Sequence, residues 1–448
     1  MEALTRINSV LNGIVWGPFM LCVLLGTGIF YSFKLHFFQI RHFPVWWRMT
    51  VMSLFKAGNN NCGNNRLSPF RAMSTALAGA IGTGNIVGVA GALSLGGAGA
   101  IFWMWIAAVF GMATIFAENV LGVKYREKHP EGYVGGPMYY IEKGLHCKWG
   151  AVIFSVLCCL ASLGMGNMTQ ANSVAGALLG GFGISPQICG IILSITVGII
   201  IFGGIKRISA LTEKLVPVMT ILYILAAFIV LGANIDRLPG ALFRIFADAF
   251  DIRSTAGGFL GYGMARAVKY GISRGVFSNE AGLGSSPIVH AAAETDDPYT
   301  QGMWGIFQVF VDTIIMCTLM ALCILTAVPD ISGLDGIALS ARAFESVLGA
   351  GGKVFISLSI ILFAFATLIS WCYFGEKSAE YLFGKGSVII FRCIYACVTY
   401  FGCILSISLV WDISDTLNGL MAIPNLCALI LLSRKINYSE ISTIRNRR

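Results

Sequence analysis

Long apolar runs separated by short polar loops dominate the hydrophobic pattern of this chain. Each of these runs approaches or exceeds about 20 residues, the length at which an α-helix crosses the hydrocarbon core of a bilayer. The pattern therefore predicts an all-α polytopic membrane protein with about 11 transmembrane helices. The predicted spans cover residues 11–33, 70–95, 97–121, 150–181, 187–205, 213–234, 255–292, 301–328, 353–374, 387–410 and 415–433.

Two further stretches, Leu238–Ile252 and Leu334–Leu348, alternate charged and apolar residues over a shorter length. This mixture is typical of helices that lie on a membrane surface. We expect both stretches to lie along the surface rather than to cross the membrane.

Glycines and polar residues interrupt two of the predicted spans at mid-length. The first interruption is Gly82-Thr83-Gly84-Asn85. The second extends from Gly275 to Gly284, within the stretch Gly271–Pro287 that ends in FSNEAGLGSSP. Glycine disfavours a helix by about 1 kcal/mol relative to alanine, and unpaired backbone groups in hydrocarbon cost several kcal/mol each. A break at that depth is tolerated where the freed groups face protein, a cavity or a ligand. Close packing of neighbouring backbones on small residues is the alternative for the first stretch.

The spans divide into two similar halves once the first span is set aside. Five spans fall in residues 70–234 and five in 255–433, and the first span of each half carries the interruption. Because five is odd, the two halves cross the membrane in opposite directions. Matching interruptions in inverted halves indicate a secondary transporter with its site near the bilayer midplane. Residues 1–69 then form an extra helix with a basic loop, and residues 434–448 a basic tail.

Composition and charge agree with this class and suggest an orientation. Hydrophobic residues make up 56% of the chain and charged residues 12%, against about 25% charged in soluble domains. The net charge of +9 comes mostly from loops 34–71 and 122–149 and from the tail. The positive-inside rule then places the N-terminus outside and the C-terminus in the cytoplasm of a plasma membrane. The charge is thus a loop property, and we expect no nucleic-acid partner.

A broken helix exposes chemistry that suits a zwitterion and a cation. Its free N–H groups and positive dipole end attract a carboxylate, and its free carbonyls coordinate a hard cation such as Na⁺. Thr83, Asn85, Ser278 and Asn279 add neutral donors and acceptors. Because the first break contains no charged residue, we expect a small neutral amino acid as the substrate.

The motifs STALAGAIGTGNIVGVAGAL, GGPMYYIEKGL, GIKRIS and FSNEAGLGSSP carry a family resemblance. Over essentially its whole length the chain resembles the alanine or glycine:cation symporters, also called sodium:alanine symporters. The resemblance implies Na⁺- or H⁺-driven uptake of alanine, glycine or a similar amino acid, with no cofactor, in a membrane that we expect to be a bacterial inner membrane. It also implies a five-plus-five inverted-repeat core, LeuT/APC-like, with one extra N-terminal helix.

The resemblance further implies which residues contact the substrate. Gln170 could instead join helices through its amide, and Trp371 could instead belong to the aromatic belt at the membrane interface. The candidate substrate-binding residues are Gly82, Thr83, Gly84, Asn85, Gln170, Phe277, Ser278, Asn279, Gly282 and Trp371.

A cation site is implied where the first break meets the span 353–374. Thr367 and Ser370 offer hydroxyls there, and Ala80, Gly82 and Thr83 offer backbone carbonyls. The family often carries a serine at the position of Ala366, so H⁺ stays open as the coupling ion beside Na⁺. A hydroxyl in a membrane helix can also bond only to its own backbone.

Several ionisable residues fall inside the predicted spans, where such residues are functional by default. Glu280 with Arg274 or Lys269 would form a gate pair or a proton relay. The alternative, which we favour, is an ion pair that holds the broken helix in shape. Glu118 is expected to be solvated near the inner end of its span, and Asp312 has no assigned role.

Two other classes of membrane protein fit the sequence less well. A channel would need a ring of like residues or a symmetric filter, which two unlike breaks in one chain do not supply. An enzyme would need a nucleophile with its base or a metal set, yet the chain has no H-E-x-x-H or G-x-S-x-G motif and only 5 histidines. A preference for glutamine or serine over alanine and glycine stays open.

Overall fold

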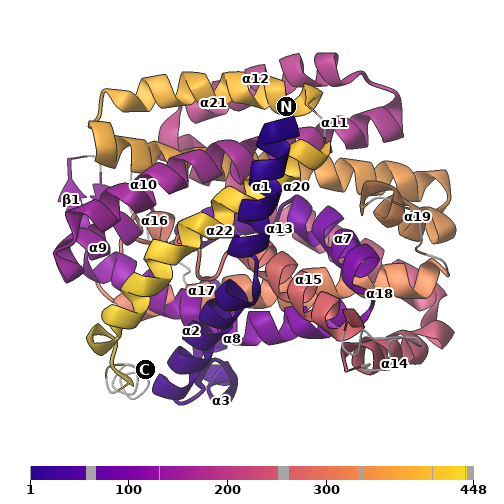
Figure 1. Cartoon of the computed structure of the whole chain (residues 1–448), viewed down its shortest axis with the longest axis horizontal. Helices are drawn as coiled ribbons and strands as arrows, with labels where there is room; N and C mark the ends of the chain where they lie inside the picture. Colours follow the sequence, from indigo (N-terminus) through magenta and orange to yellow (C-terminus); the bar gives the residue numbers. More distant parts are fainter. Residues whose placement is uncertain are drawn as a thin grey trace.

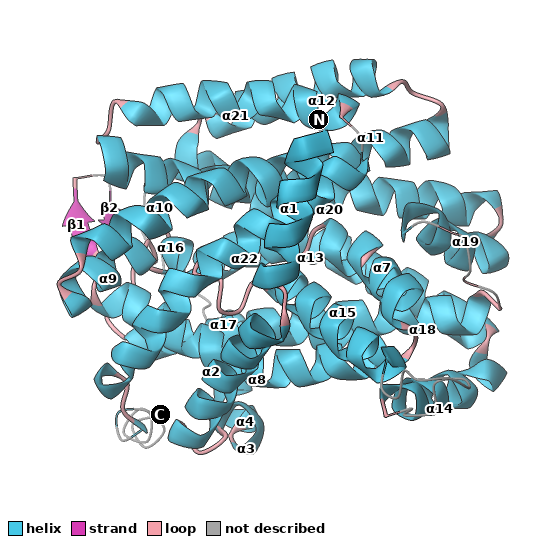
Figure 2. Ribbon diagram, viewed as in Figure 1, coloured by secondary structure: helices cyan, strands magenta, loops and turns pink. Residues whose placement is uncertain are grey.

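The computed structural model describes residues 2–56, 67–130, 132–250, 262–329, 336–405 and 407–438, together with residues 331, 334 and 440. Nearly all of them lie in helices (Figure 2). In this part of the chain the strands are β1 (Glu127–His129) and β2 (Gly132–Val134), a short antiparallel pair in which Lys128 lies opposite Tyr133.

Each of the eleven predicted spans coincides with a helix or a pair of consecutive helices. In the described residues, eight helices are long and apolar enough to cross a membrane. The number of spans rises to nine if the bent pair Pro69–Ala80 and Thr83–Gly96 is counted as one span. Of the other two spans, one is a shorter apolar helix and one is broken, and the predicted start of the latter, 255–261, lies outside the described residues. The helices are α2 (Pro18–Lys34), α6 (Pro69–Ala80) with α7 (Val87–Gly96), α8 (Gly99–Lys124), α10 (Lys148–Leu163) with α11 (Thr169–Phe182), α12 (Pro186–Ile201), α13 (Gly204–Ala233), α15 (Tyr262–Asn279) with α16 (Ser286–His290), α17 (Pro298–Val309) with α18 (Thr318–Ala327), α20 (Ala350–Phe383), α21 (Ser387–Ile404) and α22 (Ile407–Leu431).

The segments between the spans contain additional short helices. The predicted surface stretches form α14 (Leu238–Ala249) and α19 (Gly336–Leu348). The first span differs from the prediction 11–33, because α1 (Glu2–Val15) ends before α2 begins at Pro18. The basic loops contain α3 (Phe38–Arg41), α4 (Phe43–Met49), α5 (Val51–Lys56) and α9 (Pro137–Leu145).

Local sequence sets where several spans begin and end. Ser68 accepts a hydrogen bond from the N–H of Arg71, and Ser185 caps α12 in the same way, each directly before a proline. Asp297 caps α17 through the N–H of Tyr299. Hydroxyl or carboxylate caps satisfy free N–H groups at a helix start, and proline suits its first position. Gly183, with φ of +70°, ends α11 in the left-handed conformation that glycine adopts readily.

The spans run side by side between two ends of the molecule (Figure 1). Helices α12 and α21 lie along the top edge of the view, α8 and α17 lie in its lower half, and α20 passes between them. The short helices α14 and α19 lie at the right-hand end, and β1 and α9 at the left-hand end. The structure therefore separates the two predicted surface helices from the basic loop that contains β1 and α9.

The extra N-terminal helices pack against the last span of the chain. Asn12 on α1 donates to Thr416 at 3.3 Å, and Trp16 donates its indole N–H to the carbonyl of Asp415 at 2.9 Å. Further along, Tyr31 on α2 donates to the carbonyl of Leu429. The start and the end of the chain are thus joined along α22.

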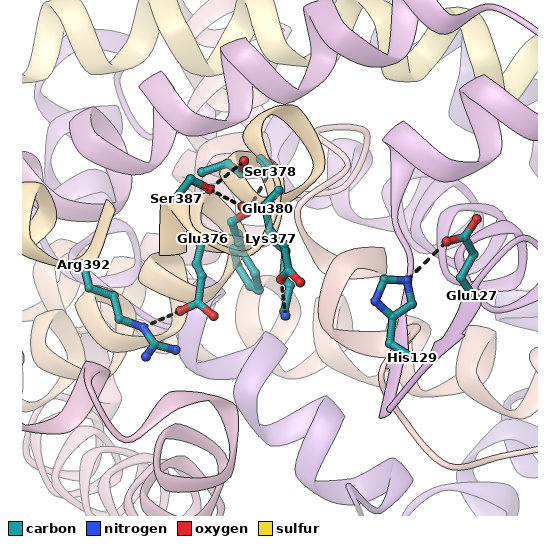
Figure 3. A network of polar contacts seen from close by, with 11 residues as sticks. Glu127, His129, Glu376, Lys377, Ser378, Glu380, Ser387 and Arg392 are labelled. Carbon is teal, nitrogen blue, oxygen red and sulfur yellow. Dashed lines mark hydrogen bonds and ion pairs between the residues drawn. The ribbon is translucent and has the colours of Figure 1, made fainter. Parts of the chain in front are cut away.

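Ion pairs and hydrogen bonds fix the end of α20 that lies near the antiparallel pair of β1 and β2 (Figure 3). Arg392 on α21 contacts Glu376 at 2.8 Å, and Lys377 contacts Glu380 at 2.6 Å. Ser387 donates to the carbonyl of Ala379 at 3.0 Å. Glu127 on β1 contacts Lys143 of α9 and His129 of its own strand, and both lower the pKa of its carboxyl.

Candidate functional site

The first predicted interruption is a true break between α6 and α7. Helix α6 ends at Ala80, a single turn η1 (Thr83–Asn85) follows, and the two halves of the span are bent by 55°. A Cβ atom on Gly82 would lie 2.5 Å from Thr367 Oγ1 and 3.1 Å from Gln170 Oε1. Glycine at position 82 therefore lets bare backbone meet side chains from two other spans.

Gln170 fixes the turn from the side of α11. Its Oε1 accepts from the backbone N–H of Thr83 at 3.2 Å and from the Thr83 hydroxyl at 3.0 Å. Its Nε2 donates to the carbonyl of Met165 at 3.2 Å. Met165 belongs to the π-helical segment η2 (Gly164–Met168), a geometry that recurs at functional sites.

Thr367 on α20 meets the end of α6 from another direction. Its hydroxyl donates to the carbonyl of Ala78 at 2.9 Å and lies 3.5 Å from that of Ile81 and 3.1 Å from that of Phe363. The Ala80 carbonyl, which was predicted to contribute here, accepts from the Gly82 N–H at 2.8 Å.

The second predicted interruption begins later than the glycine pattern indicates. Helix α15 continues through Gly275, Ser278 and Asn279, so the prediction of a break from Gly275 was wrong. A Cβ on Gly271 would lie 2.3 Å from the Ala100 carbonyl, and one on Gly275 would lie 3.2 Å from Met104. These glycines allow α15 to pack closely on α8, which is why they do not interrupt the helix.

The actual break comprises residues 280–285. Glu280, Gly282 and Gly284 have φ of +60°, +92° and +86°, values that favour glycine and strain other residues. Glu280 accepts from the Trp371 indole N–H at 2.7 Å and also from the Ser285 hydroxyl. Both contacts hold this residue in its strained conformation.

A second carboxylate supports this break from α8. Glu118 accepts from Asn425 on α22, which also donates to the Gly282 carbonyl at 3.0 Å. Glu118 is fully buried, so the expectation that it is solvated was wrong. Its span continues to Lys124, which places Glu118 deeper than the predicted end at residue 121 suggested.

The two broken spans touch each other and share Asp312. A Cβ on Gly84 would lie 3.3 Å from Ser278 Cα and 3.5 Å from the Phe277 ring. Asp312 Oδ1 accepts from Asn85 Nδ2 at 2.7 Å, and Asp312 Oδ2 accepts from Ser278 Oγ at 3.0 Å. All five of these residues are buried.

Arg274 pairs with Asp415 on α22 at 2.9 Å rather than with Glu280. Glu280 follows the last residue of α15 and has a left-handed backbone conformation, so its side chain does not continue the helix face that carries Arg274. The Arg274 guanidinium lies 5.6 Å from the Phe277 ring centroid and 5.5 Å from that of Trp411, and these two rings stack at 5.4 Å. The favoured ion pair between Arg274 and Glu280 was therefore wrong. Arg274 pairs with Asp415 instead, and its guanidinium lies near the ring of Phe277.

Three other candidate residues take no part in the contacts of Asp312 and Arg274. The Asn279 Oδ1 accepts from the Ala281 N–H at 3.0 Å and lies near Gly111 of α8. Gly282 faces Leu24 and Leu426. Ser370 is buried, and its hydroxyl has no hydrogen-bond partner within the described part of the chain.

Trp371 lies inside the protein rather than at the membrane interface. It is fully buried, and a Cβ on Gly166 would lie 2.3 Å from its side chain. The interface alternative was wrong because the span continues to Phe383, well past the predicted end at residue 374.

The sequence did not place Asp312 or identify the carbonyls of Ala78 and Ile81. The only signal for Asp312 was a lone acidic residue within an apolar run, which names no partner. Ala78 and Ile81 are apolar residues whose backbone atoms contribute, and nothing in their side chains marks them.

Comparison with known proteins places this arrangement in a family. The sodium:alanine symporter family model matches residues 1–443. The sodium/alanine symporter AgcS of Methanococcus maripaludis is 44% identical over 442 residues, which cover 97% of this chain and 95% of that protein. The probable sodium/glutamine symporter GlnT of Bacillus subtilis is 39% identical over 437 residues, which cover 97% of this chain and 90% of that protein.

A solved structure resembles the fold over most of this chain. The crystal structure of MhsT in complex with L-phenylalanine matches with a TM-score of 0.58 at 14% identity, over 81% of this chain and 88% of that chain. At this identity the likeness concerns the fold alone, and it confirms the predicted class of transporter core. The chain belongs to the sodium:alanine symporter family and is a sodium-coupled amino-acid symporter rather than an enzyme.

Proposed function

We propose that this protein carries alanine or glycine together with Na⁺ into the cell by alternating access. The contact between η1 and the last turn of α15 carries the proposal, because it brings the backbone of the first break at Gly84 against Phe277 and Ser278. Free N–H groups suit the carboxylate of an amino acid, and carbonyl and hydroxyl oxygens suit its ammonium group. The name of AgcS supports alanine as the substrate.

The substrate site comprises the residues that converge on the first break. Gly82, Thr83 and Gly84 present backbone, and Gln170 holds this backbone in position. Phe277 brings a large buried ring close to it, and the buried Trp371 packs against Gly166 of η2, the segment that Gln170 also contacts. These rings favour a small side chain on the substrate. Asn85 and Ser278 complete the set, and Asn279 and Gly282 shape the second break.

The coupling cation binds between α6 and α20. A threonine hydroxyl donates only one hydrogen bond, so the Thr367 hydroxyl cannot satisfy both the Ala78 and the Ile81 carbonyl. These carbonyl oxygens therefore keep lone pairs that are available to a cation beside Thr367. Carbonyl and hydroxyl oxygens are the ligands that a hard cation prefers. Ser370, buried one turn further on, is available to join them. The set matches Na⁺ better than H⁺, since it contains no titratable group.

The halves 70–234 and 255–433 act as the two inverted repeats of this mechanism, with the N-terminus outside and the C-terminus in the cytoplasm. The separation of the helices α14 and α19 from the basic loop of β1 and α9 supports this orientation. We expect the membrane to be the bacterial inner membrane.

Uptake into proteoliposomes tests the proposal. Purified protein should accumulate labelled alanine under an inward Na⁺ gradient and not under a K⁺ gradient or a pH gradient alone. Unlabelled glycine should compete, and glutamine should compete weakly. Accumulation driven by the pH gradient alone, or stronger competition by glutamine than by glycine, would overturn the assigned ion or substrate.

A further inference from the structure

The helices α3 and α4 connect two spans and lie against other spans of the protein. They follow the end of α2, next to α8 (Figure 2). Trp46 of α4 contacts the ring of Phe310 at 5.7 Å, and Trp47 contacts the ring of Phe307 at 6.1 Å. Phe310 begins the π-helical segment η4 (Phe310–Cys317) and follows the 12 residues of α17, which correspond to about 18 Å of helix. Helix α4 therefore lies beside the membrane-crossing part of the protein, and its outer face meets lipid.

Contacts with the end of the chain show on which side of the protein α3 and α4 lie. The Nε2 atom of His42 lies 3.0 Å from the Tyr438 hydroxyl. The ring of Phe38 lies 5.7 Å from that of Phe116, which in turn lies 6.0 Å from the ring of Tyr299 near the start of α17. The tail and the start of α17 lie on the cytoplasmic side in the proposed orientation. Helices α3 and α4 therefore border the cytoplasmic leaflet.

The outer face of α3 and α4 combines arginine with large apolar side chains. Arg41 and Arg48 are exposed, and so are Ile40 and Phe43. Within the described part of the chain, neither guanidinium forms a hydrogen bond or an ion pair. Residues 34–71 contain no aspartate or glutamate that could supply one. The two positive charges therefore have no partner in the protein that the structure describes.

Other basic residues on the same side of the protein have partners within it. Arg71 contacts Glu213 at 2.7 Å, and Arg126 donates to the carbonyls of Ala291 at 3.3 Å and Ala293 at 2.6 Å. The positive-inside rule accounts for basic residues on this side. It does not explain why the two arginines on the outer face of α3 and α4 lack a partner.

We propose that Arg41 and Arg48 bind the phosphate of an anionic phospholipid in the cytoplasmic leaflet, with Ile40 and Phe43 beside its acyl chains. Arginine keeps its apolar stem along hydrocarbon while its charge reaches the headgroups. Basic helices rich in aromatic residues bind membranes through apolar contact and through attraction to anionic lipids. Each arginine near the surface contributes about fivefold in affinity for such lipids.

The bound lipid would act on transport through the packing of α4. Phe43 contacts Phe310 at 5.9 Å and stacks on Trp47 at 5.5 Å. Lipid that holds α4 in place therefore also supports the start of η4. The same segment carries Asp312, which bonds to Asn85 and Ser278 of the two broken spans. Uptake should accordingly depend on anionic lipid.

The double substitution Arg41→Gln/Arg48→Gln tests the lipid site, because both side chains are exposed and outside the core. Native mass spectrometry of delipidated protein, titrated with phosphatidylglycerol, measures the affinity. The variant should bind this lipid about 25-fold more weakly than the native chain. Arg41→Lys/Arg48→Lys keeps two point charges for phosphate and should stay within about threefold of native affinity. Native affinity in the glutamine variant would overturn the proposal.

Arg244→Gln/Arg342→Gln is the matched control. These two exposed arginines belong to α14 and α19 at the other end of the protein (Figure 1), and Asp248 and Glu345 on the same helices offset their charge. The control should keep the affinity for phosphatidylglycerol within about twofold. Equal losses in the two double variants would reduce the effect to general surface charge and overturn the site. Displacement of the lipid by inorganic phosphate in solution would overturn the assignment to a phospholipid.

Uptake in two kinds of proteoliposome gives a second readout. Na⁺-driven alanine uptake by the native chain should be higher in phosphatidylcholine mixed with phosphatidylglycerol than in phosphatidylcholine alone. Arg41→Gln/Arg48→Gln should give the same low uptake in both membranes. An equal gain from phosphatidylglycerol in the variant and the native chain would overturn the proposal. A changed oligomeric state of the variant with unchanged lipid binding would assign this face to a second copy of the chain instead, which also overturns it.

Discussion

The two broken spans look alike in sequence, yet other parts of the protein hold them in different ways. Neutral side chains and Asp312 surround the first break. Gly82 in this break lets the backbone come within reach of Gln170 and Thr367. At the second break the contacts go to the side chain of Glu280, to the carbonyl of Gly282 and to Glu118. We infer that the first break presents groups to ligands, and that the second is a braced turn whose functional residues precede it on α15.

Gly82→Ala should have the largest effect on transport. The new Cβ would lie 2.5 Å from Thr367 Oγ1 and 3.1 Å from Gln170 Oε1, so both side chains must move. A shift of about 1 Å at a binding constellation can cost about 100-fold, and we expect at least this loss of alanine uptake.

Gly88→Ala is the matched control on the same span, because its Cβ would make only an ordinary contact of 4.0 Å with the Thr83 carbonyl. It should retain uptake. Normal uptake by Gly82→Ala, measured beside it at equal protein density, would disprove the close approach at the first break.

Gln170→Ala should have the next largest effect. It removes the acceptor for the Thr83 N–H and hydroxyl, and an unsatisfied buried polar group costs about 1–3 kcal/mol. The KM for alanine should rise about 10- to 100-fold, since 1.4 kcal/mol corresponds to about a factor of 10.

Gln39→Ala provides the comparison for a buried glutamine elsewhere, where the side chain donates to Ser32 at 2.7 Å. Its KM for alanine should stay within about twofold, with any loss appearing as lower thermal stability. If the two variants changed KM equally, Gln170 would have no special role at the first break.

Glu280→Ala should lower stability more than it alters substrate affinity. It leaves the Trp371 indole N–H and the Ser285 hydroxyl without their acceptor, a loss of about 1–3 kcal/mol. The melting temperature in detergent should fall clearly, and the KM for alanine should change by less than about threefold.

Glu280→Gln keeps an oxygen that can accept from Trp371, so it should restore most of the lost stability. Loss of uptake in Glu280→Gln at an unchanged melting temperature would contradict the bracing role. It would indicate that the charge of Glu280 takes part in transport.

Asn279→Ala should have the smallest effect, although the sequence made Asn279 and Asn85 equivalent candidates. Asn279 caps only the Ala281 N–H, a bond worth about 1 kcal/mol. Asn85 bonds to both Gly82 and Asp312. Asn85→Ala should therefore reduce uptake strongly and Asn279→Ala by less than about threefold; equal losses in the two uptake assays would remove the distinction between the breaks.

Much of the fold follows from sequence because a membrane imposes length and hydropathy. The spans were predicted by these two properties, and the turn at Gly82–Asn85 by its polar glycine-rich pattern. The same reasoning misplaced the second break, because Gly271 and Gly275 serve helix packing. A glycine in a sequence does not reveal whether it breaks a helix or admits a neighbour.

The candidate site was less predictable because its contacts join residues far apart in the chain. Asn85 and Asp312 are separated by 227 positions, and a single acidic residue in an apolar run does not indicate its partner. The segments η2 and η4 have no recognised sequence pattern here, yet they place Gln170 and Asp312 beside the break. Tertiary packing determined these positions.

The contacts of Asn12, Trp16 and Tyr31 with α22 have a consequence for biogenesis. Helices α1 and α2 acquire these partners only when α22, which is synthesised several hundred residues later, arrives. Until then, the indole and hydroxyl groups of the early helices must be accommodated by lipid, water or the insertion machinery. A nascent chain that stalls before α22 therefore leaves its beginning unfinished, which gives quality control a means to recognise incomplete copies.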